Sequence, residues 1–473
     1  MAKSNSSKTP AAAKKAAPVG SGRPTAAIVL AAGQGTRMKS RHPKVMHKVA
    51  GRTLVGHVLA TLKDEAVRPV VVVIGPDMGP VAKAVAPHKT VEQTERLGTG
   101  HAVLQAHGAL RGFEGDVLIV YGDTPFVTAA TYARMRAARA GKKPPAIVVL
   151  GFEPKDPGGY GRLVVGKKGL ERIVEVKDAS HKERKIRLCN SGIMLVDAAV
   201  LWRLLPKVTN KNAKGEFYLT DLVGLARKAK FTCAVVNGDE DELLGINSRA
   251  ELAEAEALLQ GRMRRAALEN GATLTDPSTV YFSADTVVGQ DVEIGPFVVF
   301  GPGVVVADEA VIKGFCHIEG ASIARRAVVG PHARLRPGAE IGPDAHVGNF
   351  VEIKNAVLEQ GAKVNHLTYV GDARVGPAAN IGAGTITANY DGFNKSFTDI
   401  GAKASIGSNS VLVAPVKIGD GAIVAAGAVV RKDVPADALA VNEGGQKNLA
   451  GFAPRYRAKK KAEKAARSAR RKT

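Results

Sequence analysis

Apolar runs alternate with helical stretches over the first half of the chain. Strand-like runs occupy residues 27–30, 70–74, 117–120 and 147–150. Because strands that alternate with helices form mostly parallel sheets covered by those helices, residues 25–247 are predicted to form an α/β domain. Ligands bind such sheets beyond the carboxyl ends of the strands. Two of the runs lead into polar, glycine-containing turns, at residues 31–37 and 121–125, which are therefore candidate binding loops.

A helical linker is predicted next, in residues 248–275. Ser248 and Glu251 have the spacing of a capping box, in which each side chain accepts a hydrogen bond from the other residue's backbone N–H. Apolar side chains follow at helical spacing, at Leu252, Ala255, Leu259, Met263 and Ala266. We expect one long helix that ends at about residue 270.

After residue 276 the apolar pattern changes to a period of six, which continues to about residue 441. Apolar residues recur at Val288, Ile294, Phe300, Val306, Ile312, Val329, Leu335, Ile341, Val347, Ile353, Val375, Ile381, Ile400, Ile406, Leu412, Ile418, Val424 and Val430. This period is neither helical nor alternating, and it predicts a solenoid whose apolar residues stack from coil to coil. The register breaks between Ile381 and Ile400, so residues 388–394 are expected to form a protruding loop.

Composition fits this two-part organisation, and the charge distribution adds two tails. The chain has 473 residues, with 45% hydrophobic and 23% charged residues, which is ordinary for a globular protein of two or three domains. Much of the net charge of +23 lies in residues 1–24 and 455–473. We expect residues 1–24 and 442–473 to be disordered basic tails with no specific nucleic-acid partner. Weak, salt-dependent attraction to RNA or to an anionic membrane is the alternative for these tails.

Cysteine usage and hydropathy predict a cytoplasmic protein. Cys189, Cys233 and Cys316 are odd in number, widely spaced and outside any CxxC pair, so neither a disulfide framework nor a zinc site is indicated. No apolar run approaches the roughly 18 residues that cross a bilayer, and the first 24 residues lack the hydrophobic stretch of a secretory signal. No membrane span is therefore expected.

The turn at residues 30–38 is a candidate phosphate loop. Its glycines let backbone N–H groups approach phosphate oxygens closely. Met38 stands where the dinucleotide fingerprint has its third glycine, and the Gly-Lys-Ser/Thr of a P-loop is absent from this turn. Lys44 adds a point charge suited to a triphosphate. A purely structural glycine turn is the alternative when this segment is considered alone.

The order of motifs resembles one family. They lie at residues 30–38, 43–45, 93, 97–100, 121–123, 159–162, 175, 190–192 and 245–247. From about residue 25 to residue 441 the chain resembles the bacterial bifunctional N-acetylglucosamine-1-phosphate uridyltransferases and glucosamine-1-phosphate acetyltransferases. The resemblance implies a Rossmann-like, mostly parallel α/β nucleotidyltransferase domain, followed by a left-handed parallel β-helix of hexapeptide repeats. It also implies acetyl transfer from acetyl-CoA to glucosamine 1-phosphate, then uridylyl transfer from UTP that releases pyrophosphate.

The resemblance assigns the first site residue by residue. UTP would contact Leu30, Ala31, Ala32, Gly33, Lys44, Gln93, Gly98 and Thr99, with Arg37 helping to neutralise its phosphates. The sugar phosphate would contact Tyr121, Gly122, Gly161, Glu175, Asn190 and Asn247. Asp123 and Asn247 would bind Mg²⁺, which prefers hard oxygen ligands and takes only one or two carboxylates besides phosphates and water. A turn-forming role for Asp123 and a helix-capping role for Asn247 are the alternatives.

The second site is assigned in the same way. In the solenoid, His366 would be the general base, because acetyl transfer needs a deprotonated amine and an imidazole suits that task. The sugar phosphate would contact Arg336, Lys354, Tyr369 and Asn380, and acetyl-CoA would contact Ala383, Asn389, Tyr390, Ser408 and Ala426. Glu443 stands where the family often has an arginine for the CoA phosphates, so Lys447 or the basic tail would have to replace that contact.

Two other functions remain open at this point. One is a nucleotidyltransferase whose solenoid serves only oligomerisation, as in related sugar-nucleotide pyrophosphorylases, but His366 and its partner residues argue against that function. Regulatory or exchange-factor subunits also join such domains, but they would be expected to lose Lys44 and Asp123, which this chain retains. The family resemblance further implies a homotrimer with the acyl site between neighbouring subunits, and a product used in cell-envelope synthesis.

Overall fold

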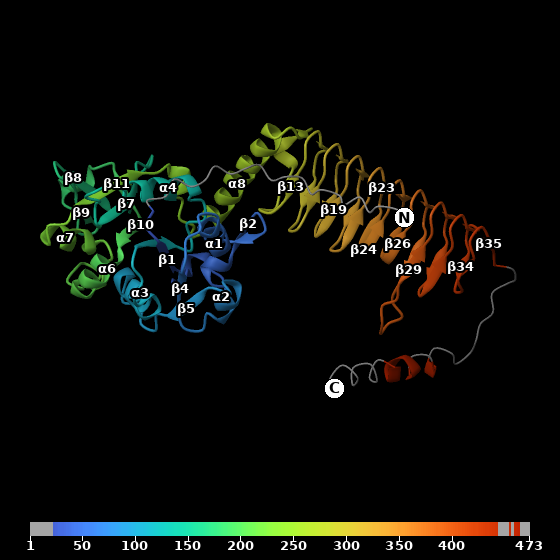
Figure 1. Ribbon diagram of the computed structural model, residues 1–473, viewed down its shortest axis with the longest axis horizontal. Helices are drawn as coiled ribbons and strands as arrows, with labels where there is room; N and C mark the ends of the chain where they lie inside the picture. Colours follow the sequence, from blue (N-terminus) through green and yellow to red (C-terminus); the bar gives the residue numbers. More distant parts are fainter. Residues whose placement is uncertain (1–21, 443–453, 456–457, 464–473) are drawn as a thin grey trace. The chain divides into compact units, whose positions relative to one another are not determined.

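The computed structural model describes residues 22–442, 454–455 and 458–463 (Figure 1). Most of both basic tails, together with Glu443 and Lys447, lies outside the described residues. The chain divides into two compact units, Met1–Ala255 and Glu256–Thr473. No helix in the described part of the chain is both long enough and apolar enough to cross a membrane.

The first unit is built on a nine-stranded mixed sheet. Its main path is β11 (Cys233–Asn237), β7 (Ile147–Phe152), β10 (Cys189–Asp197), β6 (Asp116–Tyr121), β1 (Thr25–Leu30), β4 (Val70–Ile74) and β5 (Lys89–Glu92). A hairpin of β8 (Arg162–Gly166) and β9 (Gly169–Val174) pairs beside β10. All neighbours on the main path are parallel except β10, which runs antiparallel to both β6 and β7. The mostly parallel sheet predicted from the sequence is confirmed.

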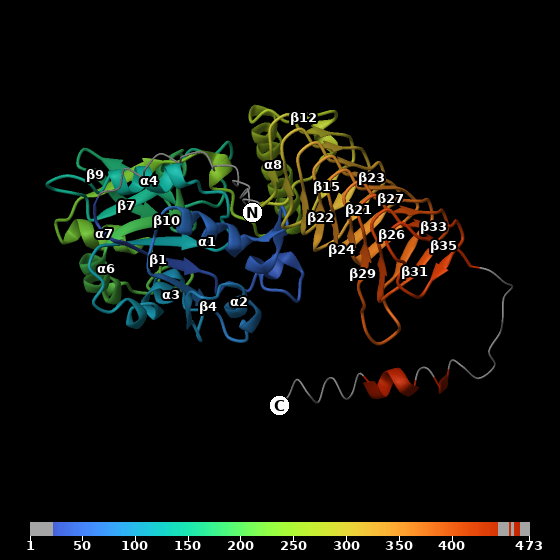
Figure 2. The same ribbon diagram turned by 45° about the vertical axis from the view of Figure 1, so that its right-hand side comes forward.

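Helices cover both faces of this sheet (Figure 2). One face packs against α1 (Leu54–Asp64), α2 (Gly79–Ala84) and α4 (Ala129–Ala137), and the other against α3 (Thr99–Gln105), α6 (Ala198–Leu204) and α7 (Asp221–Lys228). Smaller elements are β2 (Lys48–Val49), β3 (Arg52–Thr53) and α5 (His181–Arg184). Successive side chains of a strand point to opposite faces, so Ala27 and Val29 of β1 enter one core while Ala26 and Ile28 enter the other.

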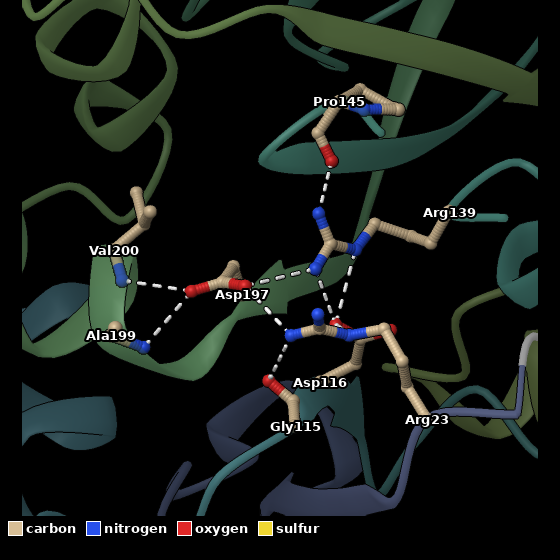
Figure 3. Close-up of polar contacts among 8 residues, drawn as sticks. All are labelled: Arg23, Gly115, Asp116, Arg139, Pro145, Asp197, Ala199 and Val200. Atoms are coloured by element: carbon tan, nitrogen blue, oxygen red, sulfur yellow. Dashed lines mark hydrogen bonds and ion pairs between the residues drawn. The ribbon is translucent and has the colours of Figure 1, made fainter. Parts of the chain in front are cut away.

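A buried ion-pair cluster lies at the start of β1 and β6 (Figure 3). Asp116, which is fully buried, accepts hydrogen bonds from Arg139 Nε at 3.1 Å and Arg23 Nε at 3.2 Å. Oδ2 of Asp197 accepts from Arg139 Nη2 at 3.1 Å and Arg23 Nη2 at 2.9 Å. Its other oxygen accepts from two backbone N–H groups at the start of α6. The cluster therefore pairs each of its charges and also caps a helix.

Helix α8 (Arg249–Glu269) begins at the predicted capping box. The Ser248 hydroxyl accepts from the Glu251 backbone N–H at 3.2 Å, and a Glu251 carboxylate oxygen accepts from the Ser248 N–H at 3.1 Å. In the second unit, Gln260 of this helix is almost fully buried and donates to the Phe282 carbonyl at 2.7 Å. The later turns of the helix thus cover the first coil of the solenoid.

The second unit is a parallel β-helix of stacked coils. One ladder consists of β12 (Thr273–Leu274), β14 (Glu293–Ile294), β17 (Val311–Ile312), β20 (Val328–Val329), β23 (His346–Asn349), β25 (Lys363–His366), β27 (Asn380–Ile381), β30 (Ser405–Ile406), β33 (Ile423–Val424) and β35 (Leu439–Ala440). The remaining strands are β13 (Val287–Val288), β15 (Val299–Phe300), β16 (Val305–Val306), β18 (His317–Ile318), β19 (Ala321–Ile323), β21 (Arg334–Leu335), β22 (Ala339–Ile341), β24 (Glu352–Leu358), β26 (Tyr369–Val375), β28 (Ile386–Ala388), β29 (Thr398–Ile400), β31 (Val411–Val413), β32 (Val416–Ile418) and β34 (Val429–Val430). Every pairing between these strands is parallel.

The period of six is confirmed as the core of this β-helix. Except for the partly buried Val288, the periodic residues are buried and form one continuous core. The predicted protruding loop is also present. Asn380 pairs with Ser405 on the next coil, so that coil is longer than its neighbours and contains the segment between β28 and β29. Within this loop Tyr390 and Lys395 form an antiparallel bridge, and the loop stands out from the coils beside β29 (Figures 1 and 2).

Candidate active sites

The phosphate-loop turn leads from β1 into two short 3₁₀ helices, at Thr36–Met38 and Lys44–Met46. Gly35, which immediately precedes the first of these helices, has φ of 64°, and a Cβ there would lie 2.5 Å from Cβ of Lys44. Only glycine allows this approach, because side chains are disfavoured at positive φ and would collide here. The turn is thereby folded back so that Lys44 borders the strand ends.

A cavity of about 290 Å³ lies beyond the carboxyl ends of β1 and β6. Ten residues assigned by the resemblance line it: Leu30, Ala31, Ala32, Gly33, Lys44, Gln93, Gly98, Thr99, Tyr121 and Asp123. The lining also contains Val45, from the motif at residues 43–45, and three residues that were not predicted from the sequence, Arg96, Ala102 and Glu216. Arg96 adjoins the motif at residues 97–100, and that position was the only signal for it. Arg37 is exposed on the first 3₁₀ helix and is not among the lining residues.

Lys44 connects the two expected Mg²⁺ ligands. Its ammonium group forms an ion pair with Asp123 Oδ2 and donates to Asn247 Oδ1 at 2.9 Å. The amide nitrogen of Asn247 donates to the Gly245 carbonyl at 3.0 Å, which turns the amide oxygen toward the lysine. One carboxylate oxygen and one amide oxygen therefore converge on a single cation, and both are oxygen donors of the kind that Mg²⁺ prefers.

The assigned sugar-binding residues lie beside Tyr121. The pKa of the Tyr121 hydroxyl is raised, mainly by burial and then by the charges of Asp123 and Glu175. Burial likewise raises the pKa of Glu175, which follows β9 and accepts from the Thr220 hydroxyl at 3.3 Å. Gly192 has φ of 88°, and a Cβ there would lie 2.6 Å from the Tyr121 ring. Tyr121 and Glu175 therefore place polar groups in a region that water reaches poorly.

The remaining assigned residues of this site are held by backbone bonds. The Asn190 N–H donates to the Gly161 carbonyl at 2.9 Å, and the Gly122 N–H donates to the Leu30 carbonyl at 2.9 Å. The amide nitrogen of Gln93 donates to the Gly98 carbonyl at 3.0 Å. The first two bonds join strand ends and loops through the backbone alone, whereas the third uses the side chain of Gln93, which also lines the cavity.

In the second unit, His366 and Asn349 end neighbouring strands. They are paired in register, and His366 Nδ1 lies 3.0 Å from the Asn349 amide oxygen. The backbone at His366 is held by the Thr368 hydroxyl, which donates to the His366 carbonyl at 2.6 Å. His366 itself is exposed, so a substrate can reach its ring.

Three cationic side chains gather near the assigned sugar-phosphate residues. The neighbouring amino group of Lys395, and then the charge of Arg336, lower the pKa of Lys354. Arg336 also forms an ion pair with Glu352 at 2.7 Å. Lys395 was not predicted from the sequence, because it belongs to the protruding loop and comes near the coils only in the folded chain.

The protruding loop is tied to the coils by a carboxylate. Asp372 accepts hydrogen bonds from the amide groups of Asn355, at 2.6 Å, and of Asn389. Asn389 is buried, while Tyr390 is exposed and its hydroxyl donates to the backbone of its own loop at 2.7 Å. The amide nitrogen of Asn389 thus anchors the loop.

The other assigned acetyl-CoA residues lie in stacked turns. The Asn409 N–H donates to the Ala383 carbonyl at 2.7 Å, and the Gly427 N–H donates to the Ser408 carbonyl at 2.8 Å. Ala383, Ser408 and Ala426 therefore occupy corresponding turns of three successive coils. Asn380 is exposed on β27, between Lys363 and Ser405 of the flanking strands.

Comparison with known proteins agrees with this two-part architecture. A family model described as a MobA-like NTP transferase domain matches residues 27–189, and one described as bacterial transferase hexapeptide repeats matches residues 285–320 and 397–432. The bifunctional protein GlmU of Paramagnetospirillum magneticum is 62% identical over 93% of this chain and 98% of its own length. The GlmU of Rhodospirillum rubrum is 62% identical over 92% of this chain and 97% of its own length. The GlmU of Maricaulis maris is 58% identical over 94% of this chain and 98% of its own length. This chain belongs to the GlmU family of bifunctional uridyltransferases and acetyltransferases.

Proposed function

We propose that the two units carry out consecutive steps of UDP-N-acetylglucosamine synthesis, each with its own set of residues. The second unit transfers acetyl from acetyl-CoA to glucosamine 1-phosphate, and the first transfers uridylyl from UTP to the N-acetylglucosamine 1-phosphate that results. Membership of the GlmU family supports both steps. One observation carries the residue assignments: the expected residues of each step gather within one unit, around Lys44 and Asp123 in the first and around His366 and Lys354 in the second.

Uridylyl transfer depends on position and charge. The attacking phosphate oxygen of the sugar phosphate is already anionic, so no general base is needed, and the α-phosphorus of UTP is attacked as pyrophosphate leaves. Asp123 and Asn247 would hold Mg²⁺, which supplies charge neutralisation to the phosphates. The Lys44 ammonium and the backbone N–H groups of the turn offer further positive charge at the cavity, with Arg96 beside them.

Acetyl transfer needs a base and a site for the sugar phosphate. The amine nitrogen of glucosamine 1-phosphate attacks the thioester carbonyl carbon, and His366 accepts the proton that the amine loses. The carbon–sulfur bond then breaks, and the CoA sulfur leaves and takes up a proton. The phosphate, a dianion, is attracted by three neighbouring cations, Arg336, Lys354 and Lys395. Tyr369 and Asn380 are assigned to the sugar.

A homotrimer located in the cytoplasm, supplying cell-envelope synthesis, is part of the same proposal. Hexapeptide repeats support self-association. An exposed ladder on the coils, Phe297, Phe315, His332 and Phe350, stacks ring on ring at 4.9–5.0 Å, and each phenylalanine is more than half exposed. Such an apolar edge is unusual on a monomer. Light scattering on the purified protein should report three chains per particle, and a monomer would refute this part.

The two-site assignment is tested by following CoA thiol and pyrophosphate separately, each with its own substrates and Mg²⁺. His366→Ala should abolish thiol release and leave pyrophosphate release intact, whereas Asp123→Ala should do the reverse. Burial raises the pKa of Cys233 and Cys316 to about 11, so the protein's own thiols will react slowly in the thiol assay. If either substitution stopped both half-reactions in a folded protein, the assignment would be wrong.

A further inference from the structure

Asn349 stands directly beside the ring assigned as the base of acetyl transfer. It is the last residue of β23, and parallel register places it opposite His366, the last residue of β25. Its amide oxygen lies 3.0 Å from His366 Nδ1. Within residues 22–442, this is the one side-chain hydrogen bond that the His366 ring makes. The contact therefore decides how this imidazole is oriented.

The chemistry of the contact fixes the tautomer. An amide oxygen is only an acceptor, so the hydrogen bond requires a proton on His366 Nδ1. A neutral imidazole has one N–H, and Nε2 is then left with its lone pair. We propose that Asn349 is a positioning residue for acetyl transfer: its amide oxygen holds His366 in the Nδ1–H form and leaves Nε2 free to accept the substrate's proton. This inference rests on the proposed role of His366 as general base.

The bond persists through the proton transfer. When Nε2 takes the proton from the amine, Nδ1 keeps its own, so the imidazolium still donates to the Asn349 oxygen. The backbone on either side does not need to move, since the His366 carbonyl accepts from the Thr368 hydroxyl and from the Gly384 N–H at 3.2 Å. The asparagine thus orients the base without adding a charge to it.

Replacement of Asn349 separates a positioning role from a structural one. Asn349→Ala should lower kcat for CoA thiol release by about ten- to a hundredfold, a large part of what general base catalysis contributes, with little change in KM. Asn349→Asp is isosteric and should restore most of kcat. Its carboxylate favours the imidazolium, however, so the acid limb of the pH–rate profile should move to higher pH. A side chain with a merely structural role would not move that limb.

Controls make failure of this inference distinguishable from failure of the proposed function. Thiol release that survives in His366→Ala would refute the general-base role itself. If His366→Ala is inactive while Asn349→Ala and Asn349→Asp match the wild type in kcat and pH profile, only the role of Asn349 is refuted. Adding Asn349→Ala to His366→Ala should cost nothing more, because both residues act through one imidazole. His346→Ala, exposed on the same strand, should keep both activities.

Discussion

Asp116 shows what one buried carboxylate does for the first unit. Asp116→Ala would leave Arg139, which is only 2% exposed, without its main counter-charge in the core. Removing one partner of a buried pair costs about 3–5 kcal/mol, because the other charge stays buried. Denaturant unfolding, monitored in the first unit, should show that decrease in the free energy of unfolding.

Arg23 provides the matched comparison, since it contacts the same carboxylate from the surface. It is 41% exposed, and exposed pairs contribute about 1 kcal/mol or less. Arg23→Ala should therefore change the free energy of unfolding far less than Asp116→Ala. Equal losses in the two variants would mean that burial does not set the strength of this cluster.

The buried carboxyl group of Glu175 should make the free energy of unfolding depend on pH. Burial raises its pKa in the folded chain, so its stabilising contribution is complete below the ordinary glutamate pKa and is lost as the pH rises through the folded-state value. Glu175→Gln removes that loss. At pH 8 the variant should be more stable than the wild type, and in acid the difference should vanish. Melting temperatures measured across pH would test this, and a difference independent of pH would contradict it.

At the scale of elements, the protruding loop depends on its anchor. Asp372→Ala removes the acceptor for Asn389 and Asn355, so the loop that carries Lys395 would lose its attachment to the coils. We expect KM for glucosamine 1-phosphate to rise about tenfold, equivalent to one charged hydrogen bond, while kcat changes little. Steady-state kinetics of thiol release would measure both. An unchanged KM would show that the loop keeps its place without Asp372.

The sequence predicts elements well where one period dominates. A period of six can be buried only by stacking coils, so Ile353 and its equivalents specify the β-helix. The antiparallel β10 was not predictable, because apolar runs do not encode strand direction. Asn349 and Lys395 were missed for a related reason: the first meets His366 through coil register, and the second through a loop of irregular length.

For the first site, motif order identified residues that line one cavity, but it did not give side-chain direction. Arg37 follows the glycine turn in sequence, yet it lies exposed outside the cavity lining, whereas Arg96 lies within it. Gly98 explains part of this geometry, since its φ of 112° and its closeness to the Phe217 backbone permit no side chain. Such approaches arise from tertiary packing, which a single sequence does not contain.

At the scale of the whole molecule, the two cores of the first unit share no residue with the core of the β-helix. The cores of the first unit end at Leu243, and the core of the β-helix begins at Ala267. Family membership decides against the two other functions considered from the sequence, a single-site pyrophosphorylase and a non-enzymatic subunit. Because the two units do not share a core, we expect the two activities to have separate stabilities.

Thermal inactivation should therefore distinguish the units. Leu335 is fully buried in the β-helix, and Leu335→Ala should cost about 2–5 kcal/mol through lost burial and a residual cavity. For a unit of this size that loss lowers the temperature of half-inactivation of acetyl transfer by roughly 5–15 °C. Uridylyl transfer, measured on the same heated samples, should be lost at the wild-type temperature. Leu118→Ala, in the sheet core, should give the opposite pattern, whereas simultaneous loss of both activities in each variant would mean that the chain unfolds as one cooperative unit.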